Sequence, residues 1–147
     1  MLRISKLTDY AMLILSQMAK AQNLIMSATL LAEVLHLSVP TVSKILKILA
    51  DASLVTSIRG ADGGYRLSRS ATEITLADVI SAMEGDVAMT ECCESKSLCA
   101  IDSQCGVREN WRKINKLIHA LLAGFTILDM TEPLSVDCGI QRLIHPT

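Results

Sequence analysis

Apolar residues recur at helical spacing through the first third of the chain. In the first such pattern they lie three or four residues apart: Leu7, Ala11, Ile14 and Met18. This spacing places them on one face of a helix over about residues 5–21. Two further patterns predict helices over residues 28–36, after the N-cap candidate Ser27, and over residues 40–53, with Pro40 in the first turn. Three amphipathic helices in succession are therefore expected.

The next segment has the composition of a β-hairpin. Residues 54–59 are rich in β-branched side chains, residues 60–64 contain three glycines, and residues 65–67 resume the extended pattern. Beyond the hairpin, Thr75 and Asp78 resemble a capping box at the start of a short helix. The first half of the chain is thus predicted to contain helices followed by a hairpin and a further helix.

The second half has two contrasting parts. Residues 85–106 show no periodicity and contain four of the five cysteines. From Val107 onward, apolar residues alternate at spacings of four and three: Val107, Trp111, Ile114, Ile118, Leu121, Phe125 and Leu128. A helix of this span is roughly 33 Å long. Its stripe is buried either by a second copy of the chain, which we expect, or by the rest of its own domain.

Composition and charge narrow the class of protein. Half of the residues are apolar, a fifth are charged and only three are proline, which excludes a disordered or collagen-like chain. The net charge of −1 conceals eight Lys or Arg against four Asp or Glu in residues 1–70, and six against eleven in residues 71–147. A basic first half is typical of a chain with a polyanionic partner, although so small an excess also arises by chance.

The sequence contains no segment that indicates a membrane protein or an enzyme. No apolar run reaches the ~18 residues needed to cross a bilayer, and Asp9 interrupts a weak signal-peptide pattern. No Ser/His/Asp set, phosphate-binding loop or pair of carboxylates stands out. We therefore expect a cytoplasmic protein, without enzyme activity, whose cysteines are reduced ligands or sensors rather than disulfides.

A helix-turn-helix followed by a hairpin is the arrangement of many DNA-binding domains, although helical domains that bind no DNA share it. The second helix of such a unit, here residues 40–53, enters the major groove, and an arginine on the wing enters the minor groove. Short hydroxyls reach base edges or phosphates, and lysines neutralise phosphate. The candidate DNA contacts are Ser38, Pro40, Thr41, Ser43, Lys44, Lys47, Arg59, Tyr65 and Arg66.

Four cysteines form a second candidate site. Five residues separate Cys93 from Cys99 and Cys99 from Cys105, and Cys92 adjoins the first of them. Thiolates suit zinc or an iron–sulfur cluster, although this spacing is neither the paired pattern of structural zinc nor the bacterial ferredoxin pattern. Cysteines without a ligand, or a redox disulfide relay, are the alternatives. Cys138 lies outside the spacing, and we expect it to be incidental.

Several stretches of the chain together carry a family resemblance. They are residues 7–11 (LTDYA), 37–46 (LSVPTVSKIL), 59–67 (RGADGGYRL) and 80–85 (ISAMEG), with the three-cysteine loop followed by Trp111. These motifs resemble the winged-helix iron–sulfur transcription regulators of the IscR and NsrR type. Residues 90–92 and 105–115 are most similar to the regulators of the SUF iron–sulfur assembly operon. The resemblance covers about residues 1–130.

The resemblance implies a homodimeric transcription factor that binds operator DNA, holds an iron–sulfur cluster, expected as 2Fe-2S, and controls cluster-assembly genes. It implies Cys99, Cys105 and either Cys92 or Cys93 as ligands. IscR takes a fourth ligand from a histidine three residues past the last cysteine, where this chain has Arg108, which cannot ligate iron.

Three candidates remain for the fourth ligand. They are the other cysteine of the 92/93 pair, Glu109, and Asp9 of the partner subunit, as an N-terminal aspartate serves in NsrR. IscR also carries a glutamate on its recognition helix where this chain has Ser43, so its operator sequence does not carry over.

We thus predict a mainly α protein with a winged helix-turn-helix domain, a two-stranded wing and a long dimerisation helix. Its expected segments are the DNA-binding domain 1–84, the cysteine-rich cluster-binding loop 85–106, the dimerisation helix 107–130 and a flexible tail 131–147. The second interpretation is a winged-helix repressor that senses thiol oxidation or zinc without a cluster. A third is an iron–sulfur carrier or scaffold that binds no DNA.

Overall fold

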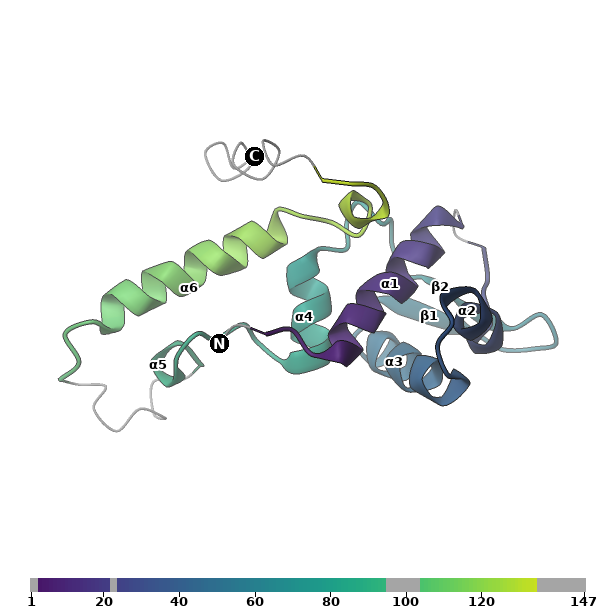
Figure 1. Cartoon of the computed structure of the whole chain (residues 1–147), viewed down its shortest axis with the longest axis horizontal. Coiled ribbons are helices and arrows are strands. Elements are labelled where there is room, and N and C mark those ends of the chain that lie inside the picture. Colours follow the sequence, from purple (N-terminus) through teal and green to yellow (C-terminus); the bar gives the residue numbers. More distant parts are fainter. Residues whose placement is uncertain (1–2, 22–23, 95–103, 135–147) are drawn as a thin grey trace.

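The structure, a computed structural model, describes residues 3–21, 24–94 and 104–134. A group of helices with a small hairpin forms one end of the molecule, and one long helix extends away from it (Figure 1). The elements in chain order are α1 (Lys6–Lys20), α2 (Ala28–Leu35), α3 (Val39–Asp51), β1 (Val55–Ile58), β2 (Gly64–Leu67), α4 (Leu76–Glu84), α5 (Glu91–Glu94), α6 (Arg108–Ala123) and the 3-10 helix η1 (Asp129–Thr131).

Side-chain caps define where the helices begin. The Ser27 hydroxyl accepts a hydrogen bond from the Leu30 N–H at 3.1 Å, and Pro40 lies in the first turn of α3, both as predicted. The predicted capping box is also present, because the Thr75 hydroxyl accepts from the Asp78 N–H while the Asp78 carboxylate accepts from the Thr75 N–H. Such caps satisfy backbone N–H groups that have no partner inside the helix.

A tight turn joins α2 to α3 at a bend of 120°. His36, at the end of α2, adopts a left-handed conformation with φ 54°, and the Leu37 N–H donates to the Ala32 carbonyl at 2.9 Å. This geometry is that of a helix-turn-helix unit.

In the part of the chain that the structure describes, no single helix is long and apolar enough to span a membrane. Taken together, the bent pair of α2 and α3 has the length and apolar composition of a membrane span, by those two criteria alone.

The core lies where α1, α3 and α4 pack together and against the hairpin. Its large, fully buried apolar side chains are Ile14, Leu15, Met18, Leu31, Val42, Ile45, Leu46, Leu49, Ile74, Val79 and Ile127. Burial of each contributes roughly 1.5–3 kcal/mol to stability. Ile127 belongs to the segment that follows α6, so the chain returns to this core after the long helix.

Val55 and Leu67 anchor the hairpin in the core, and one further contact of the hairpin was not predicted from the sequence patterns. β1 and β2 pair antiparallel in the register Val55 to Leu67. Met26 then bridges the outer side of β2: its N–H donates to the Tyr65 carbonyl at 2.9 Å, and its carbonyl accepts from the Tyr65 N–H at 2.8 Å. A single bridging residue has no periodicity, which is why the sequence gives no signal for it. Gly60, with φ 117°, supplies the left-handed turn of the wing.

The long helix is shorter than its apolar stripe predicts. α6 ends at Ala123, so the predicted helix over residues 107–130 is wrong, and Phe125 and Leu128 lie beyond its end. Gly124 caps the helix through hydrogen bonds from its N–H to Ala120 and Leu121 carbonyls.

Residues 125–128 leave the helix because they pair with the segment before α4. The Leu76 N–H donates to the Phe125 carbonyl, and the Ile127 N–H donates to the Ile74 carbonyl, each at 2.9 Å. The Ile127 side chain is fully buried. A continued helix would lose both backbone bonds and this burial, so the extended return is preferred.

The cysteine-rich region holds one short element. α5 spans only Glu91–Glu94, too short for its periodicity to be read from the sequence. Residues 95–103 and 135–147 lie outside the described residues, so the predictions for Cys99, for Cys138 and for a flexible tail are not tested.

Gly64→Ala is expected to destabilise the wing. A Cβ at this position would lie 2.7 Å from the Met26 carbonyl oxygen. Because that oxygen belongs to the backbone, it cannot move away as a flexible side chain could. We expect the free energy of unfolding in urea to fall by about 1–3 kcal/mol. Gly106→Ala is the matched control, because its Cβ meets nothing within 4 Å. An unchanged urea midpoint in Gly64→Ala would contradict the Met26 bridge.

Candidate nucleic-acid interface and cysteine site

α3 presents one buried and one exposed face. Its buried positions are Val42, Ile45, Leu46 and Leu49. Its exposed predicted contacts are Ser38, Pro40, Ser43, Lys44 and Lys47. Thr41 is half-buried, and its hydroxyl lies 2.7 Å from that of Ser38, so the two hydroxyls form a pair at the start of the helix. The outward face therefore combines hydroxyls at the N-terminal end with two lysines further along.

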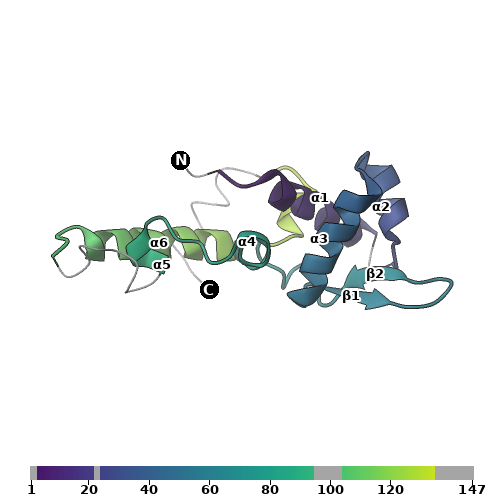
Figure 2. The ribbon, with the colours of Figure 1, turned by 90° about the horizontal axis from the view of Figure 1, so that it is seen from below.

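The wing lies at the end of α3, and its loop projects past α2, on the side away from α6 (Figure 2). Arg59 lies on the loop and Arg66 on β2, opposite Thr56, and both arginines are exposed. Tyr65 differs from the other predicted contacts, because its half-buried side chain packs against the core. The backbone of Tyr65 pairs with Met26, which explains the position of this residue. Contact between Tyr65 and DNA stays a prediction.

Cys92 and Cys93 converge on one hydroxyl. The Thr90 Oγ1 lies 3.1 Å from the Cys92 Sγ and 3.3 Å from the Cys93 Sγ. Cys92 is only 8% exposed, Cys93 is half-buried, and both are free thiols. The two sulfur atoms therefore face the same point although they are neighbours in the chain.

Cys105 lies just before α6 and is a half-buried free thiol. Its carbonyl accepts from the Arg108 N–H at 3.4 Å. Of the other predicted ligands, Asp9 is exposed in the first turn of α1. The Glu109 Oε1 lies 3.3 Å from the Arg112 Nη1. Among residues 3–21, 24–94 and 104–134, no three His, Cys, Asp or Glu side chains are grouped closely enough to hold a metal.

The segment that leads to the cysteine pair is bound to α6 by side chains. We call residues 85–90, between α4 and α5, the linker segment. The Asn115 Oδ1 accepts from the Met89 N–H, and its Nδ2 donates to the Val87 carbonyl, each at 2.9 Å. The Arg112 Nε donates to the Cys92 carbonyl at 3.3 Å. Sequence reasoning placed Asn115 in a family motif but gave it no role, because a polar residue at a helical position carries no signal of its partner.

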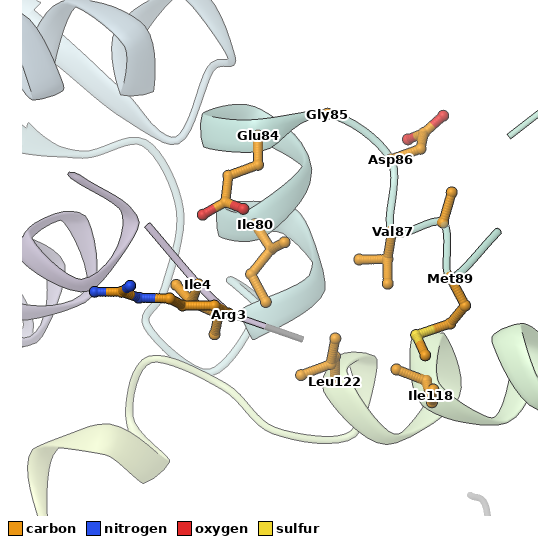
Figure 3. Close-up of a pocket in the computed structure, with 11 residues that line it drawn as sticks. Arg3, Ile4, Ile80, Glu84, Gly85, Asp86, Val87, Met89, Ile118 and Leu122 are labelled. Carbon is orange, nitrogen blue, oxygen red and sulfur yellow. The ribbon is translucent and has the colours of Figure 1, made fainter. Parts of the chain in front are cut away.

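A cavity of about 530 Å³ lies between the linker segment, α4, α6 and the residues before α1 (Figure 3). Its lining is largely apolar: Ile4, Ile80, Val87, Ala88, Met89, Ile118 and Leu122. The linker segment therefore borders open space along part of its inner side, while Val87 packs against the core.

Glu84 joins the end of α4 to the start of α1. Its Oε1 accepts from the Ser5 N–H at 2.8 Å and from the hydroxyl of Thr8, which is fully buried. The hydrogen bond from Thr8, followed by that from Ser5, lowers the pKa of Glu84 below its ordinary value of 4.5. The carboxylate thus ties α1 to the residue at which the linker segment begins.

α6 leaves an apolar face uncovered. None of its residues is buried, and Trp111 and Ile114 of the predicted stripe are 37% and 41% exposed. Leu117, which lies off the predicted stripe, is 62% exposed and extends the same face. Val107, just before the helix, is also exposed. A face of this kind is typical of an interface between chains.

Comparisons with known proteins match nearly the whole chain. The family model Rrf2, described as an iron-dependent transcriptional regulator, matches residues 4–133. Protein aau3 of Rhizobium meliloti (strain 1021) is 35% identical over 149 residues, which cover 99% of this chain and 97% of that protein. The family consists of transcriptional regulators and not of enzymes.

Two solved structures share the architecture. The structure of T. potens IscR has a TM-score of 0.63 and 28% identity, covering 88% of this chain and 85% of that chain. The oxidized form of Staphylococcus aureus CymR has a TM-score of 0.65 and 25% identity, covering 92% of this chain and 100% of that chain. The predicted winged-helix fold is therefore confirmed.

Glu84→Gln is expected to lower stability at neutral pH and to have no effect in acid. A carboxyl group whose pKa is lowered by folding stabilises the folded state above its ordinary pKa, and this contribution is lost as the pH falls through the folded value. Because Glu84 is solvent-exposed, we expect a loss below about 1 kcal/mol.

Thermal unfolding between pH 7 and pH 3 measures this loss. The melting temperatures of the wild type and Glu84→Gln should differ at pH 7 and converge as the pH falls through the lowered pKa of Glu84. Glu33→Gln, an exposed glutamate on α2, is the matched control. A constant difference across the range would show that the carboxylate charge is not the source of the effect.

Proposed function

This chain belongs to the Rrf2 family of transcriptional regulators, and we propose that it binds operator DNA under the control of an iron–sulfur cluster held by its cysteines. The observation that carries the proposal is the convergence of Cys92 and Cys93 on Thr90, at the end of a segment tied both to α6 and to the winged domain. A change at the thiols can thus reach the surface that faces DNA.

The DNA-binding part of the proposal assigns α3 to the major groove and the wing to the minor groove. Lys44 and Lys47 neutralise phosphates, the hydroxyls of Thr41 and Ser43 reach base edges or phosphates, and Arg59 enters the minor groove. All but Thr41 are exposed, which supports this assignment. Two copies joined through the apolar face of α6 would place two such surfaces on successive half-sites of one duplex.

The sensing part assigns the cluster to Cys92 or Cys93, Cys99 and Cys105. Thiolates are the ligands that iron–sulfur clusters require, and among the described residues Cys92, Cys93 and Cys105 are free thiols. When bound, the cluster, proposed as 2Fe-2S, supplies a link between these thiolates that depends on iron supply and redox state. We take the second cysteine of the 92/93 pair as the fourth ligand, because both sulfurs already face one hydroxyl.

The proposed targets are iron–sulfur assembly genes of the SUF type, and the proposed location is the cytoplasm, where such a regulator meets its DNA. The motifs at residues 90–92 and 105–115 support this target, since they are the ones most similar to SUF regulators. The two motifs are also in contact, because the Arg112 Nε of the second donates to the Cys92 carbonyl of the first, which supports a common role.

A repressor that senses thiol oxidation or zinc is the second candidate function. Two neighbouring free thiols facing one hydroxyl favour it, as does the likeness to the oxidized form of Staphylococcus aureus CymR. Visible absorbance separates the two functions, because an anaerobically purified cluster protein is brown, whereas a zinc or thiol protein is colourless. Membership of a family of transcriptional regulators argues against a carrier that binds no DNA.

Lys44→Ala is expected to weaken binding to all DNA sequences and to flatten the dependence on salt. A lost phosphate contact lowers the slope of log K against log salt by roughly 0.9. Fluorescence anisotropy of a labelled duplex at several salt concentrations measures both quantities. Lys116→Ala, on the exposed part of α6, is the matched control. The same slope for wild type and Lys44→Ala would mean that α3 does not face the DNA.

Cys105→Ser is expected to abolish cluster binding, and Cys99→Ser likewise, because serine is a harder and much less acidic ligand than cysteine. Iron and sulfide content after anaerobic reconstitution measure the loss, and circular dichroism checks the fold. Cys138→Ser is the matched control and should keep the cluster. Full occupancy in Cys105→Ser would overturn the ligand assignment and favour the thiol or zinc repressor.

A further inference from the structure

The side chain of Asn115 binds the backbone of the linker segment through one donated and one accepted hydrogen bond, as the backbone of a paired strand would. Asn115 binds the Val87 carbonyl through its Nδ2 and the Met89 N–H through its Oδ1, both at 2.9 Å. A side-chain amide carries the same donor and acceptor as a peptide group. It therefore satisfies two backbone groups that no strand or helix satisfies, in a segment without regular structure.

A second side chain extends this contact to the cysteines. Arg112 lies three residues before Asn115, on the same face of α6, and its Nε donates to the Cys92 carbonyl. The Arg112 side chain is only 22% exposed. Together the two residues bind the backbone at positions 87, 89 and 92, so the cysteine pair lies at the end of a segment aligned along one face of α6.

Apolar packing does not fix the linker segment on its own. The cavity of about 530 Å³ lies along its inner side and is lined by Val87, Met89, Ile118 and Leu122, of which Val87 and Leu122 also pack against the core (Figure 3). A side chain next to such a space loses part of its packing contacts. The hydrogen bonds from α6 therefore hold the segment together with the packing of Val87.

The other end of the segment is bound to the winged domain. Gly85, with φ 90°, turns the chain out of α4 immediately after Glu84, which accepts hydrogen bonds from Ser5 and Thr8. The described chain thus runs from an anchor on α1, through the linker segment, to an anchor on α6 and then to Cys92.

We propose that Asn115 is a positioning residue. By binding the linker segment, it fixes the position of Cys92 and Cys93 relative to α6. This inference rests on the proposed function, since it makes Asn115 part of the device that presents the cysteines. Asn115 touches neither thiol in the described contacts, and acts through the backbone of residues 87–89.

Three full-length variants test the proposal in the reduced, metal-free protein. Asn115→Ala removes both bonds, Asn115→Asp keeps the acceptor for the Met89 N–H but loses the donor to Val87, and Asn110→Ala changes an exposed asparagine of the same helix. The readouts are hydrogen exchange of the Met89 amide by NMR and the alkylation rate of each cysteine by peptide mapping.

Asn115→Ala should speed both Met89 exchange and Cys92 alkylation by about three- to tenfold, the range for the loss of one or two hydrogen bonds. Asn115→Asp should keep the Met89 amide protected, and Asn110→Ala should match the wild type. Alkylation of Cys138 should be the same in all four proteins. The proposal would be overturned if Asn115→Ala had the same Cys92 alkylation rate and the same Met89 exchange rate as the wild type, with an unchanged urea midpoint.

A second readout separates this inference from the proposed function. After anaerobic reconstitution, Asn115→Ala should lose iron to a chelator several-fold faster than the wild type, with the same visible absorbance per iron. If the wild type takes up no cluster, the proposed function fails, while the Met89 and Cys92 rates still decide the role of Asn115. Equal rates of iron loss alongside equal Cys92 alkylation would contradict the positioning role.

Discussion

The pairing of residues 125–127 with residues 74–76 is the contact on which the placement of α6 depends. It directs the chain back to the start of α4 and buries Ile127 in the core of the winged domain. Because the linker segment leaves the other end of α4, the path from α4 through the cysteine-rich region and α6 closes on α4 itself. The long helix is thus held at its far end, and its near end carries Cys105.

This closure gives the cysteine site a mechanical connection to the surface that would face DNA. Glu84 joins the start of the linker segment to α1 through Ser5 and Thr8, and α1 packs on α3 in the core. Bonds from α6 fix the other end of the segment. A change in the cysteines therefore has two routes to α3, one through the hydrogen-bonded linker segment and one through α6.

Much of the fold follows from local sequence patterns, and the exceptions have physical causes. Periodicity and capping residues predicted the first three helices, the wing and the capping box, because each depends on neighbours within a few residues. The apolar stripe overestimated the length of α6, since Phe125 continues the spacing although the helix is capped at Gly124 and Phe125 pairs with Leu76 over a long range. The Met26 bridge and the role of Asn115 were missed for the same reason: single polar or backbone contacts between distant segments leave no pattern. The exposed lysines of α3 were placed correctly from their spacing, whereas Tyr65 proved to pack against the core.

The central claim is that the cysteine site and the DNA surface are coupled, and DNA affinity tests it most directly. One anaerobic preparation of the wild-type chain is titrated with its operator before and after iron is removed by a chelator, at a single salt concentration. Coupling of about 1–3 kcal/mol predicts that the two dissociation constants differ by roughly five- to 150-fold. Superimposable binding curves, with iron shown to be bound in one sample and absent in the other, would contradict it.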